Sequence, residues 1–319
     1  MKTGVTLYQT TSGLYRRVQK LMGNRFELTI LAQDEEKAKV SLDAAVAEIQ
    51  RIEKLLTTFA DTSETNKINA LAGISPFTPS PEVYELIARS RRISELTQGA
   101  FDITYGGVDK SLWNFDTSLK RLPSAEVAQA SVRLVNYKNV LLNPKEKSVL
   151  LKYPGMRIGF GGIGKGYAAE RAKLVLQQLG IKSGIVNAAG DLTAWGNQPN
   201  GQPWTIGIAD PDAAQKPFSK FNITGMAVAT SGNYEKFVII NGKRYSHTIN
   251  PKTGLPVTGI KSVTILCPNA ELADAMATPV MVMGVKVGLA LINQMKNIAC
   301  ILVDDQDRIF YSDNIRLTA

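Results

Sequence analysis

Apolar residues recur every three or four positions in several stretches of the chain, the spacing that places them on one face of a helix. The first stretch begins after Asp34, a good helix-capping residue, and continues to Leu56. A second helix is expected over Ser80–Gly99, because Ser followed by Pro is a typical helix start and Gly a typical end. Ser124 gives a similar start signal, and another long helix is expected over Tyr167–Leu179. The pattern therefore predicts several amphipathic helices before position 180.

Segments typical of β-strands become more frequent after the last of these helices. Strands are expected at Arg25–Ala32, Gly184–Ala188, Ser262–Cys267 and Ile298–Val303. Asn241-Gly242 predicts a hairpin over Phe237–Tyr245, because Asn and Gly readily adopt the positive φ angles of a type I′ turn. A helical region, Glu271–Met295, separates the last two strands. With no repeat and no segment typical of a linker, we predict one α+β domain over residues 1–319, formed by one or two lobes.

Length and hydropathy limit the location of the protein. A chain of 319 residues can bury a sizeable core. No apolar run is long enough to cross a bilayer, and Ala277–Val285 is among the longest. Residues 1–23 contain neither the apolar segment of an export signal nor a lipid-accepting cysteine. Two locations are therefore expected: the cytoplasm, or the outer side of the membrane (periplasmic or membrane-anchored) if a leader has been removed.

The distribution of charge does not favour nucleic acid as a partner. The chain has 37 Lys and Arg against 28 Asp and Glu, a formal net charge of +9. These basic residues are scattered, with short pairs such as Arg16-Arg17 rather than a dense tract, and aromatic residues do not alternate with them. We expect a solvated surface with a positive bias and no nucleic-acid partner.

Two cysteines and one histidine restrict the metals that the chain can bind. Cys267 and Cys300 lie in apolar runs typical of strands, and we predict that both are free buried thiols. With His247 as the only histidine, a zinc site is effectively excluded. Any metal is expected to be a hard cation held by oxygen atoms.

A glycine-rich segment, Gly159–Gly166, fits two phosphate-binding patterns. The P-loop pattern fails because Gly166 stands where a magnesium-binding Ser or Thr is required. The dinucleotide pattern has support from a following helix and from Asp191, but the chain lacks the alternating βαβ run of a doubly wound sheet. Glycines and Lys165 at a helix start still favour an anionic ligand over the alternative, a tight loop that needs positive φ angles.

Two further segments carry candidate chemistry. Asp274 and Thr278 are four residues apart with small residues between them, so on a helix their oxygen atoms share a face that suits Mg²⁺. This pair alone is a weak signal. The segment Ser246–Pro256 combines prolines, a glycine and hydroxyl groups, which predicts a rigid polar loop that displays His247.

Taken together, these segments resemble the FAD:protein FMN transferase family, ApbE, whose members were formerly called thiamine biosynthesis lipoproteins. The matching segments follow one another in consistent order along almost the whole chain: Leu21–Gly23, Thr58-Phe59, Ser63-Glu64, Ile68-Asn69, Gly99–Thr104, Gly162–Ala168, Asn187–Asp191, Val228–Gly232, His247–Pro256 and Ala273–Thr278. Each segment is short, but their common order is very specific.

The resemblance implies a T-fold-like α+β architecture with mixed or antiparallel sheets and FAD bound between two lobes. The positions that match the family's FAD contacts are Met22, Phe59, Ala100, Phe101, Asp102, Gly159, Lys165 and His247. Asp274 and Thr278 match Mg²⁺ ligands, joined in the family by a backbone carbonyl that falls on Gly162. His247 and Asp274 are the expected catalytic residues.

The implied reaction is Mg²⁺-dependent transfer of FMN from FAD to a Ser or Thr hydroxyl of an acceptor protein, with release of AMP. His247 is expected either to orient or neutralise the pyrophosphate or to accept the hydroxyl proton. Hydrolysis of FAD by water at the same site, and FAD binding without chemistry, are the alternatives. Family acceptors are membrane redox subunits and related exported proteins; neither the particular acceptor nor the oligomeric state can be read from the sequence.

Five positions depart from the family pattern. The chain has Gly159 where an acidic residue is usual, Asn250 in place of Asp, Asn24 in place of Thr, and Phe59 in place of Tyr. Pro279 directly follows the expected ligand Thr278 and disfavours helical geometry there. We therefore expect the helix to end or kink at this proline.

Overall fold

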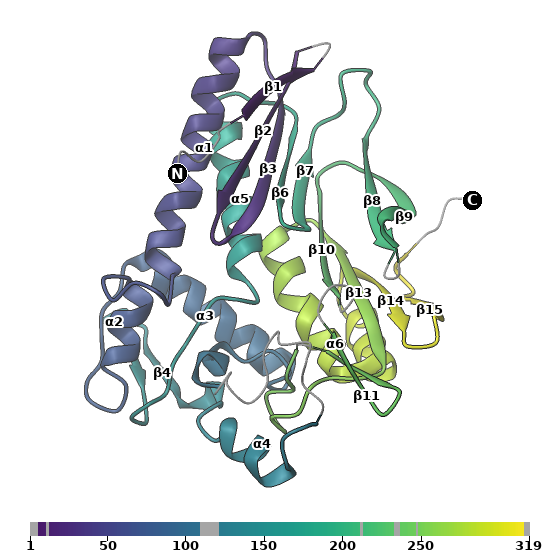
Figure 1. The fold of residues 1–319 in the computed structure, drawn as a ribbon. Helices are drawn as coiled ribbons and strands as arrows, with labels where there is room; N and C mark the ends of the chain where they lie inside the picture. The colour runs from purple at the N-terminus through teal and green to yellow at the C-terminus, as the bar shows by residue number, and fades with distance from the viewer. Residues whose placement is uncertain are drawn as a thin grey trace.

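The computed structural model describes residues 6–10, 13–108, 121–210, 213–232, 237–246 and 248–315. Its main feature is a nine-stranded sheet in the order β1-β2-β3-β6-β7-β10-β13-β14-β15, in which every neighbouring pair is antiparallel (Figure 1). These strands are β1 (Thr6–Thr10), β2 (Leu14–Leu21), β3 (Asn24–Leu31), β6 (Gly184–Ala188), β7 (Asp191–Trp195), β10 (Met226–Gly232), β13 (Ile260–Cys267), β14 (Ala299–Asp304) and β15 (Ile309–Tyr311). The antiparallel pairing excludes a doubly wound sheet and agrees with the predicted α+β class.

Six α-helices and three two-stranded ribbons complete the described part of the chain. The helices are α1 (Glu35–Leu56), α2 (Glu64–Ala70), α3 (Pro81–Leu96), α4 (Ala125–Ser131), α5 (Gly164–Gln178) and α6 (Ala270–Asn293). The ribbons pair β4 (Val140–Asn143) with β5 (Ser148–Leu151), β8 (Trp204–Asp210) with β9 (Ala213–Ile223), and β11 (Phe237–Ile240) with β12 (Lys243–Ser246). Short 3₁₀ helices lie at Ile103–Gly107 and Tyr137–Asn139.

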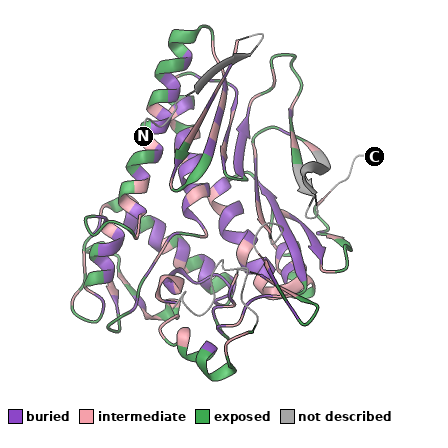
Figure 2. Ribbon diagram, viewed as in Figure 1, coloured by how far each residue is buried: buried purple, intermediate pink, exposed green. Residues whose placement is uncertain are grey.

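Helices α1, α5 and α6 pack on one face of the sheet, and their shared interior is the main core (Figures 1 and 2). On β3, Phe26, Leu28 and Ile30 are fully buried, while the residues between them are partly exposed. This alternation is the two-residue period of a strand with one face in the core. Helix α1 contributes Leu42 and Ile49 from its apolar face.

The other face of the sheet carries a second, smaller core. Leu192, Val228 and Leu266 point to this side and pack with Trp204 and Ile223 of the β8–β9 ribbon. The central strand β13 is therefore buried along its whole length. Alternate residues of β7 and β10 must then face the helices.

Local sequence signals explain several element boundaries. The Asp34 side chain accepts a hydrogen bond from the Lys37 amide at 2.8 Å and caps α1. The predicted hairpin is present, with φ angles of 52° at Asn241 and 75° at Gly242. Strand β6 has the predicted bounds. The two cysteines are free and buried on β13 and β14, as predicted.

Helix α6 corrects the expectation for Pro279. The helix continues through this proline and is interrupted at Gly284, where φ is 80° and ψ is 171°. Ala275 to Ala277 are buried against the core, so tertiary packing outweighs the local bias of the residue before a proline. Gly284 provides the interruption because only glycine adopts this backbone conformation readily.

Helix α6 also corrects the expectation that no apolar segment is long enough to span a bilayer. Within the described part of the chain, this 24-residue helix contains an 18-residue window with a mean hydropathy of 1.8, and so meets that criterion by length and composition. The criterion is also met by buried core helices, and α6 packs on β10 and β13. Its contacts with the sheet account for its apolar character.

Candidate functional site

The glycine-rich loop, residues 159–166, follows the β4–β5 ribbon in the chain and leads into the start of α5. The Gly159 amide donates to the Ile103 carbonyl at 3.0 Å, and the Gly164 amide donates to the Phe160 carbonyl at 2.7 Å. Ile163, at the helix cap position, provides no side-chain cap. Other groups must therefore satisfy the first amides of α5.

A carboxylate of α6 satisfies one of these amides. Gly166 donates its backbone N–H to Asp274 Oδ2 at 2.9 Å. The two helices approach so closely here that a Cβ atom on Gly166 would lie 2.1 Å from the Ala270 carbonyl oxygen. In return, the first amide of α6, on Ala270, donates to Glu170 Oε1 of α5 at 2.8 Å. The anion that this amide binds is therefore the protein's own Asp274 carboxylate, and the expected anionic ligand at this helix start stays a prediction.

Lys165 lies between two buried carboxylates. Its Nζ forms an ion pair with Asp191 and lies 4.0 Å from Asp274 Oδ1. The Asp191 and Asp274 side chains are only 4% and 7% exposed. In the sequence, Asp191 belonged to a dinucleotide pattern and to a segment that matches the family, but its role as the Lys165 partner was missed. Two buried carboxylates with one ammonium leave excess negative charge, which suits a cation.

Thr278 lies one helical turn beyond Asp274, as predicted. Its hydroxyl is 3.2 Å from the Ser231 hydroxyl of β10. The donors in this region are carboxylate and hydroxyl oxygen atoms, the set that Mg²⁺ prefers. No group of three His, Cys, Asp or Glu side chains with metal-site geometry occurs among the described residues. The donor set therefore fits Mg²⁺ if carbonyl, water or phosphate oxygens complete the coordination, and the Gly162 carbonyl remains the predicted protein donor.

The glycine-rich loop also gathers several of the predicted nucleotide contacts. A Cβ atom on Gly164 would lie 3.7 Å from the terminal methyl of Met22, and one on Gly162 would lie 3.4 Å from the Phe101 ring. Met22 is in the β2–β3 turn with a φ angle of 50°, and its carbonyl accepts from the Asn24 side chain at 2.8 Å. Asn24, one departure from the family pattern, thus stabilises the turn that presents Met22.

Ala100, Phe101 and Asp102 are buried, with exposures of 4%, 6% and 8%. The Asp102 carboxylate accepts hydrogen bonds from the Thr104 amide and hydroxyl and from the Tyr137 amide. Burial raises the pKa of Asp102 despite these bonds. Its side chain thus holds together the segments that contain Thr104 and Tyr137.

Phe59 differs from the other predicted contacts because this residue is 99% exposed. It lies on the short connection between α1 and α2. Helix α2 was missed in the sequence, which showed only a polar, hydroxyl-rich segment there. The available signal was Ser63, whose hydroxyl accepts from the Asn66 amide at 3.0 Å and caps this helix.

His247 lies outside the described residues, so its catalytic and FAD-binding roles stay predictions. The residues around it form a well-bonded loop. The Ser246 hydroxyl accepts from the Thr248 amide at 2.8 Å, and Asn250 Oδ1 accepts from the Lys252 amide at 2.9 Å. Gly254 has a φ angle of 71°, and a Cβ atom there would lie 1.9 Å from a carbonyl oxygen of α4. Residues 248–256 of this loop are thus held by hydrogen bonds and by the close packing of Gly254 on α4.

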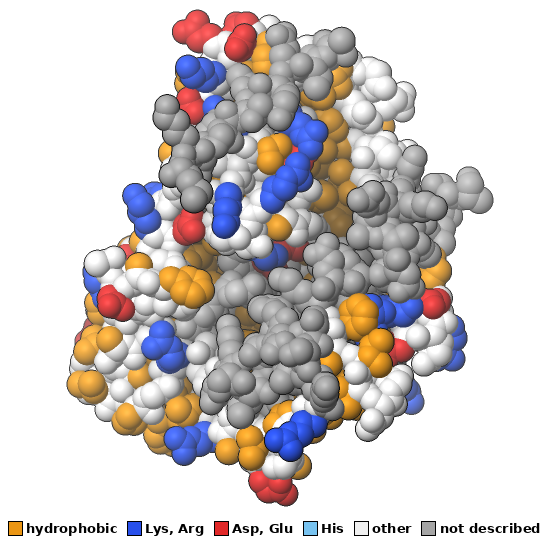
Figure 3. Space-filling model, in the orientation of Figure 1, with side chains coloured by type: hydrophobic (Ala, Val, Ile, Leu, Met, Phe, Trp, Pro, Cys, Tyr) orange, Lys and Arg blue, Asp and Glu red, His pale blue; other side chains and the backbone are white. Residues whose placement is uncertain are grey.

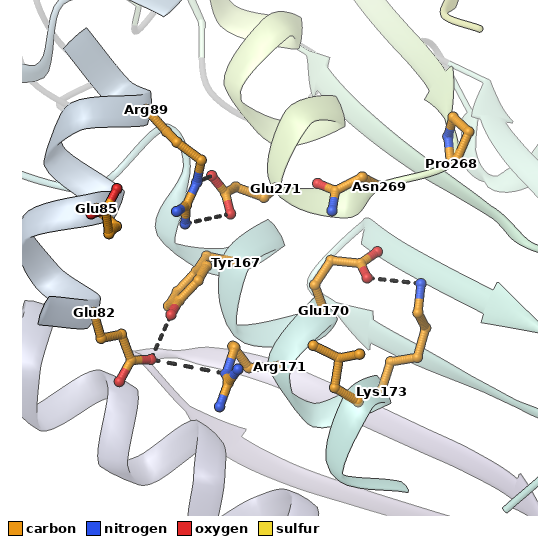
Figure 4. A pocket seen from close by; sticks show the side chains of 11 residues that line it. Glu82, Glu85, Arg89, Tyr167, Glu170, Arg171, Lys173, Pro268, Asn269 and Glu271 are labelled. Atoms are coloured by element: carbon orange, nitrogen blue, oxygen red, sulfur yellow. Dashed lines mark hydrogen bonds and ion pairs between the residues drawn. The ribbon is translucent and has the colours of Figure 1, made fainter. Parts of the chain in front are cut away.

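A charged depression of about 680 Å³ lies along α3, α5 and the start of α6 (Figure 4). Its main contacts are ion pairs and hydrogen bonds: Arg89 with Glu271, Tyr167 with Glu82, Arg171 with Glu48 and Glu82, and Lys173 with Glu170. These groups already bind one another, and their interactions join the three helices. Neither Lys165 nor Asp274 lines the depression, which is therefore distinct from the site that contains them. On the face shown in Figure 3, Lys and Arg are spread over the surface rather than gathered in one patch.

The fold and the site define an α+β protein in which a glycine-rich helix start, a lysine and oxygen donors converge. Residues 22–302 match the ApbE family, and the chain therefore belongs to that family. The FAD:protein FMN transferase of Klebsiella pneumoniae (strain 342) is 32% identical over 299 residues, covering 93% of this chain and 91% of the relative. The protein of the same name from Escherichia coli (strain K12) is 30% identical and covers 83% of this chain and 77% of the relative.

Solved structures of ApbE proteins have a fold similar to that of this chain. The ApbE protein from Thermotoga maritima has a TM-score of 0.84 and 30% identity, covering 94% of this chain and 97% of that one. The flavinyl transferase ApbE from Pseudomonas stutzeri, in its apo form, has a TM-score of 0.80 and 28% identity, covering 96% and 94%. The chain thus has the ApbE architecture and belongs to the class of enzymes that these names describe, the flavin transferases.

Proposed function

We propose that this enzyme transfers FMN from FAD to a Ser or Thr hydroxyl of an acceptor protein and releases AMP, with Mg²⁺ as its metal. The observation that carries this proposal is that Asp274 binds the first turn of α5 close to Lys165, while Thr278 lies one turn further along α6. The names of the related proteins support the flavin substrate and the protein acceptor.

Asp274, Thr278 and the Gly162 carbonyl are the groups that would hold Mg²⁺. The metal, when bound, neutralises pyrophosphate charge and favours attack at phosphorus. Asp274 is well suited to this role because the Gly166 amide fixes one of its oxygen atoms. The other oxygen, Oδ1, is the one nearest to Lys165.

The remaining groups bind and orient the reactants. Lys165 supplies a positive charge for a phosphate oxygen, and Asp191 holds its ammonium group. Met22 and the exposed ring of Phe59 provide apolar surface for the nucleotide. His247 orients or neutralises the pyrophosphate, or accepts the proton of the attacking hydroxyl.

In this reaction the acceptor oxygen forms a bond to the FMN phosphorus. The bridging P–O bond of the pyrophosphate breaks, and AMP leaves with that oxygen. The hydroxyl proton passes to a base. When water takes the place of the hydroxyl, the products are FMN and AMP, which is the hydrolytic alternative.

Incubation with FAD, Mg²⁺ and a Thr-containing acceptor polypeptide tests this proposal. Mass spectrometry of the acceptor and chromatography of the nucleotides separate the outcomes. An FMN adduct together with AMP is expected. AMP without an adduct would indicate hydrolysis, and unchanged FAD would indicate binding alone; either result would contradict the proposed transfer.

Asp274→Asn tests the metal assignment in the same assay. We expect loss of Mg²⁺-dependent transfer, because the amide lacks the charge that holds the cation. Glu36→Gln is the matched control, since Glu36 is exposed in the first turn of α1. The last turn of this helix reaches the site, and its start lies about 30 Å away. Normal transfer by Asp274→Asn would contradict the role of Asp274.

As the acceptor, we propose a redox protein with an accessible Ser or Thr, in keeping with the acceptors of the family. The compartment in which the two proteins meet also stays a prediction, with the cytoplasm and the outer side of the membrane as the two candidates.

A further inference from the structure

Phe59 is unusual because a fully exposed aromatic ring is carried by a segment whose backbone is firmly held. The residue as a whole is 99% exposed. The Phe59 amide donates to Thr57 Oγ1 at 3.2 Å. The carbonyls on either side of it, of Thr58 and Ala60, both accept hydrogen bonds from one side chain, Asn66 of α2.

Asn66 uses its complete hydrogen-bonding capacity in this arrangement. Its Nδ2 donates to the Thr58 and Ala60 carbonyls, at 3.0 Å each. Its Oδ1 accepts from Arg157 Nη2 at 3.2 Å and from Asn69 Nδ2 at 3.4 Å. Asn66 is only 8% exposed, so these bonds form where water cannot easily replace them.

Asn69 extends the arrangement to the glycine-rich loop. Its Oδ1 accepts from the Ile158 amide at 2.8 Å, and its Nδ2 also donates to the Ile158 carbonyl at 3.1 Å. Ile158 directly precedes Gly159, which lies beside Thr58. A Cβ atom on Gly159 would be 3.8 Å from the Thr58 methyl group. The two asparagines therefore tie the Phe59 segment and the start of the glycine-rich loop to the same short helix.

An aromatic ring that is exposed to water is stabilised when its apolar surface is covered. A ring on a mobile loop would reduce its exposed apolar area by packing onto the surface, and binding would have to reverse that change. A ring on a fixed backbone is already available to a planar ligand. Asn66 has the chemistry for this task, because its amide supplies two donors to the two carbonyls that flank Phe59.

We propose that Asn66 is a positioning residue for the nucleotide site, which acts through Phe59 by holding its backbone in the binding conformation. The inference rests on the proposed function, because it requires that the ligand is FAD and that Phe59 contacts it. In this proposal, Asn66 and helix α2 fix the backbone of Phe59 and take no part in binding Mg²⁺.

A double-mutant cycle measures whether Asn66 acts through Phe59. The dissociation constant of FAD is measured in the presence of Mg²⁺ by flavin fluorescence for the wild type, Asn66→Ala, Phe59→Ala and the double variant. Phe59→Ala should weaken binding on the order of tenfold, the loss expected for one stacked ring. Asn66→Ala should weaken it several-fold, but should add less than about twofold when Phe59 is already alanine. Hydrogen exchange at residues 58–60 should accelerate in Asn66→Ala.

Thr65→Val is the matched control for loss of α2 stability. Thr65 is a buried neighbour on the same helix, and its hydroxyl donates to the Leu55 carbonyl at 3.1 Å without bonding the Phe59 segment. It should lower the melting temperature and leave FAD affinity unchanged at temperatures well below unfolding. Should Asn66→Ala fail to fold, Asn66→Ser, which retains one hydroxyl donor, takes its place in the cycle.

Three results would overturn the inference. The first is equal weakening by Asn66→Ala in both Phe59 backgrounds, which would show that Asn66 acts independently of the ring. The second is comparable weakening by Thr65→Val, which would indicate a general stability effect. The third is unaltered affinity in Phe59→Ala. Failure of the wild type to bind FAD would instead contradict the proposed function, and it is recognised without any variant.

Discussion

The backbone amide of Gly166 and the carboxylate of Asp274 are joined by a hydrogen bond of 2.9 Å, although they are 108 residues apart in the sequence. This bond connects the first turn of α5 with the helix that carries the proposed metal ligands. Because Glu170 makes the reciprocal bond to the Ala270 amide, the two helix starts stabilise each other. The position of Asp274 therefore depends on the close approach of α5 and α6.

Gly166→Ala tests this dependence. The added Cβ would lie 2.1 Å from the Ala270 carbonyl and 2.7 Å from Asp274 Cβ, so the helices must separate. We expect a loss of about 3 kcal/mol in the free energy of unfolding, measured by denaturant titration, and weaker Mg²⁺ binding measured by calorimetry. Gly161→Ala is the control, because a Cβ there would meet no atom within 4 Å. Equal stability of the two variants would contradict the packing argument.

Lys165→Met, alone and together with Asp191→Leu, should distinguish the contribution of Lys165 to stability from its contribution to FMN transfer. The variant leaves the buried Asp191 carboxylate without its partner, and we expect a destabilisation of about 3 kcal/mol. Adding Asp191→Leu should restore much of this stability by removing the unpaired charge, but it should not restore FMN transfer. Thermal unfolding and the transfer assay give the two readouts. Recovery of transfer in the double variant would show that Lys165 has no direct role with the substrate.

Glu82 should contribute to stability in a pH-dependent manner. Its hydrogen bond from Arg51 lowers its pKa below the ordinary value of 4.5. Because the folded-state pKa is the lower one, the stabilisation is complete above the ordinary value and is lost as pH falls through the lowered value. Glu82→Gln should therefore lower the melting temperature at pH 7, and this difference should shrink below about pH 4.

The control for Glu82 is Glu85→Gln. Glu85 forms an ion pair with Lys147, and both side chains are about half exposed. Exposed pairs contribute little, so this variant should change the melting temperature only slightly at either pH. A constant effect of Glu82→Gln between pH 7 and pH 3 would contradict the assigned charge interaction.

The two cysteines should be inert in the folded protein. Burial raises the pKa of Cys267 to about 11 and raises that of Cys300 still further. The thiolate is the reactive form, so neither side chain should react with a thiol reagent at pH 8 under native conditions. In guanidinium chloride, 2 thiols per chain should react. Rapid labelling of the native protein would show that one of these strands opens readily.

Local signals in the sequence predicted much of the fold. Asp34 caps α1 through a bond to a residue three positions away, and Asn241-Gly242 forms its turn from neighbouring backbone angles. Such interactions span few residues and can be read directly. The short helix α2 escaped detection because its seven residues are mostly polar and lack an apolar period. The expected kink at Pro279 was wrong because packing of α6 on the sheet overrides a local preference.

The sequence was sufficient to select most of the site residues, but it did not predict which of them contact one another. The resemblance to the family selected Lys165, Asp274 and Thr278, and the structure places the first two together and the third one turn away on α6. It did not identify Asp191 as the partner of Lys165, because that pairing depends on how β7 lies beside α5. It also gave no reason to expect that the Asp102 carboxylate accepts three hydrogen bonds from Thr104 and Tyr137.

The interruption at Gly284 divides α6 into two parts that differ in burial. Asp274 and Thr278 both lie before it, in the part whose direction is fixed by the sheet and by α5. After it, Lys286 and Val287 are exposed. The non-helical angles at Gly284 break the continuous helix, so the two parts do not form one straight axis. Relatives of this enzyme could therefore alter the second part, or the loop that follows it, without changing the spacing between the two proposed metal ligands.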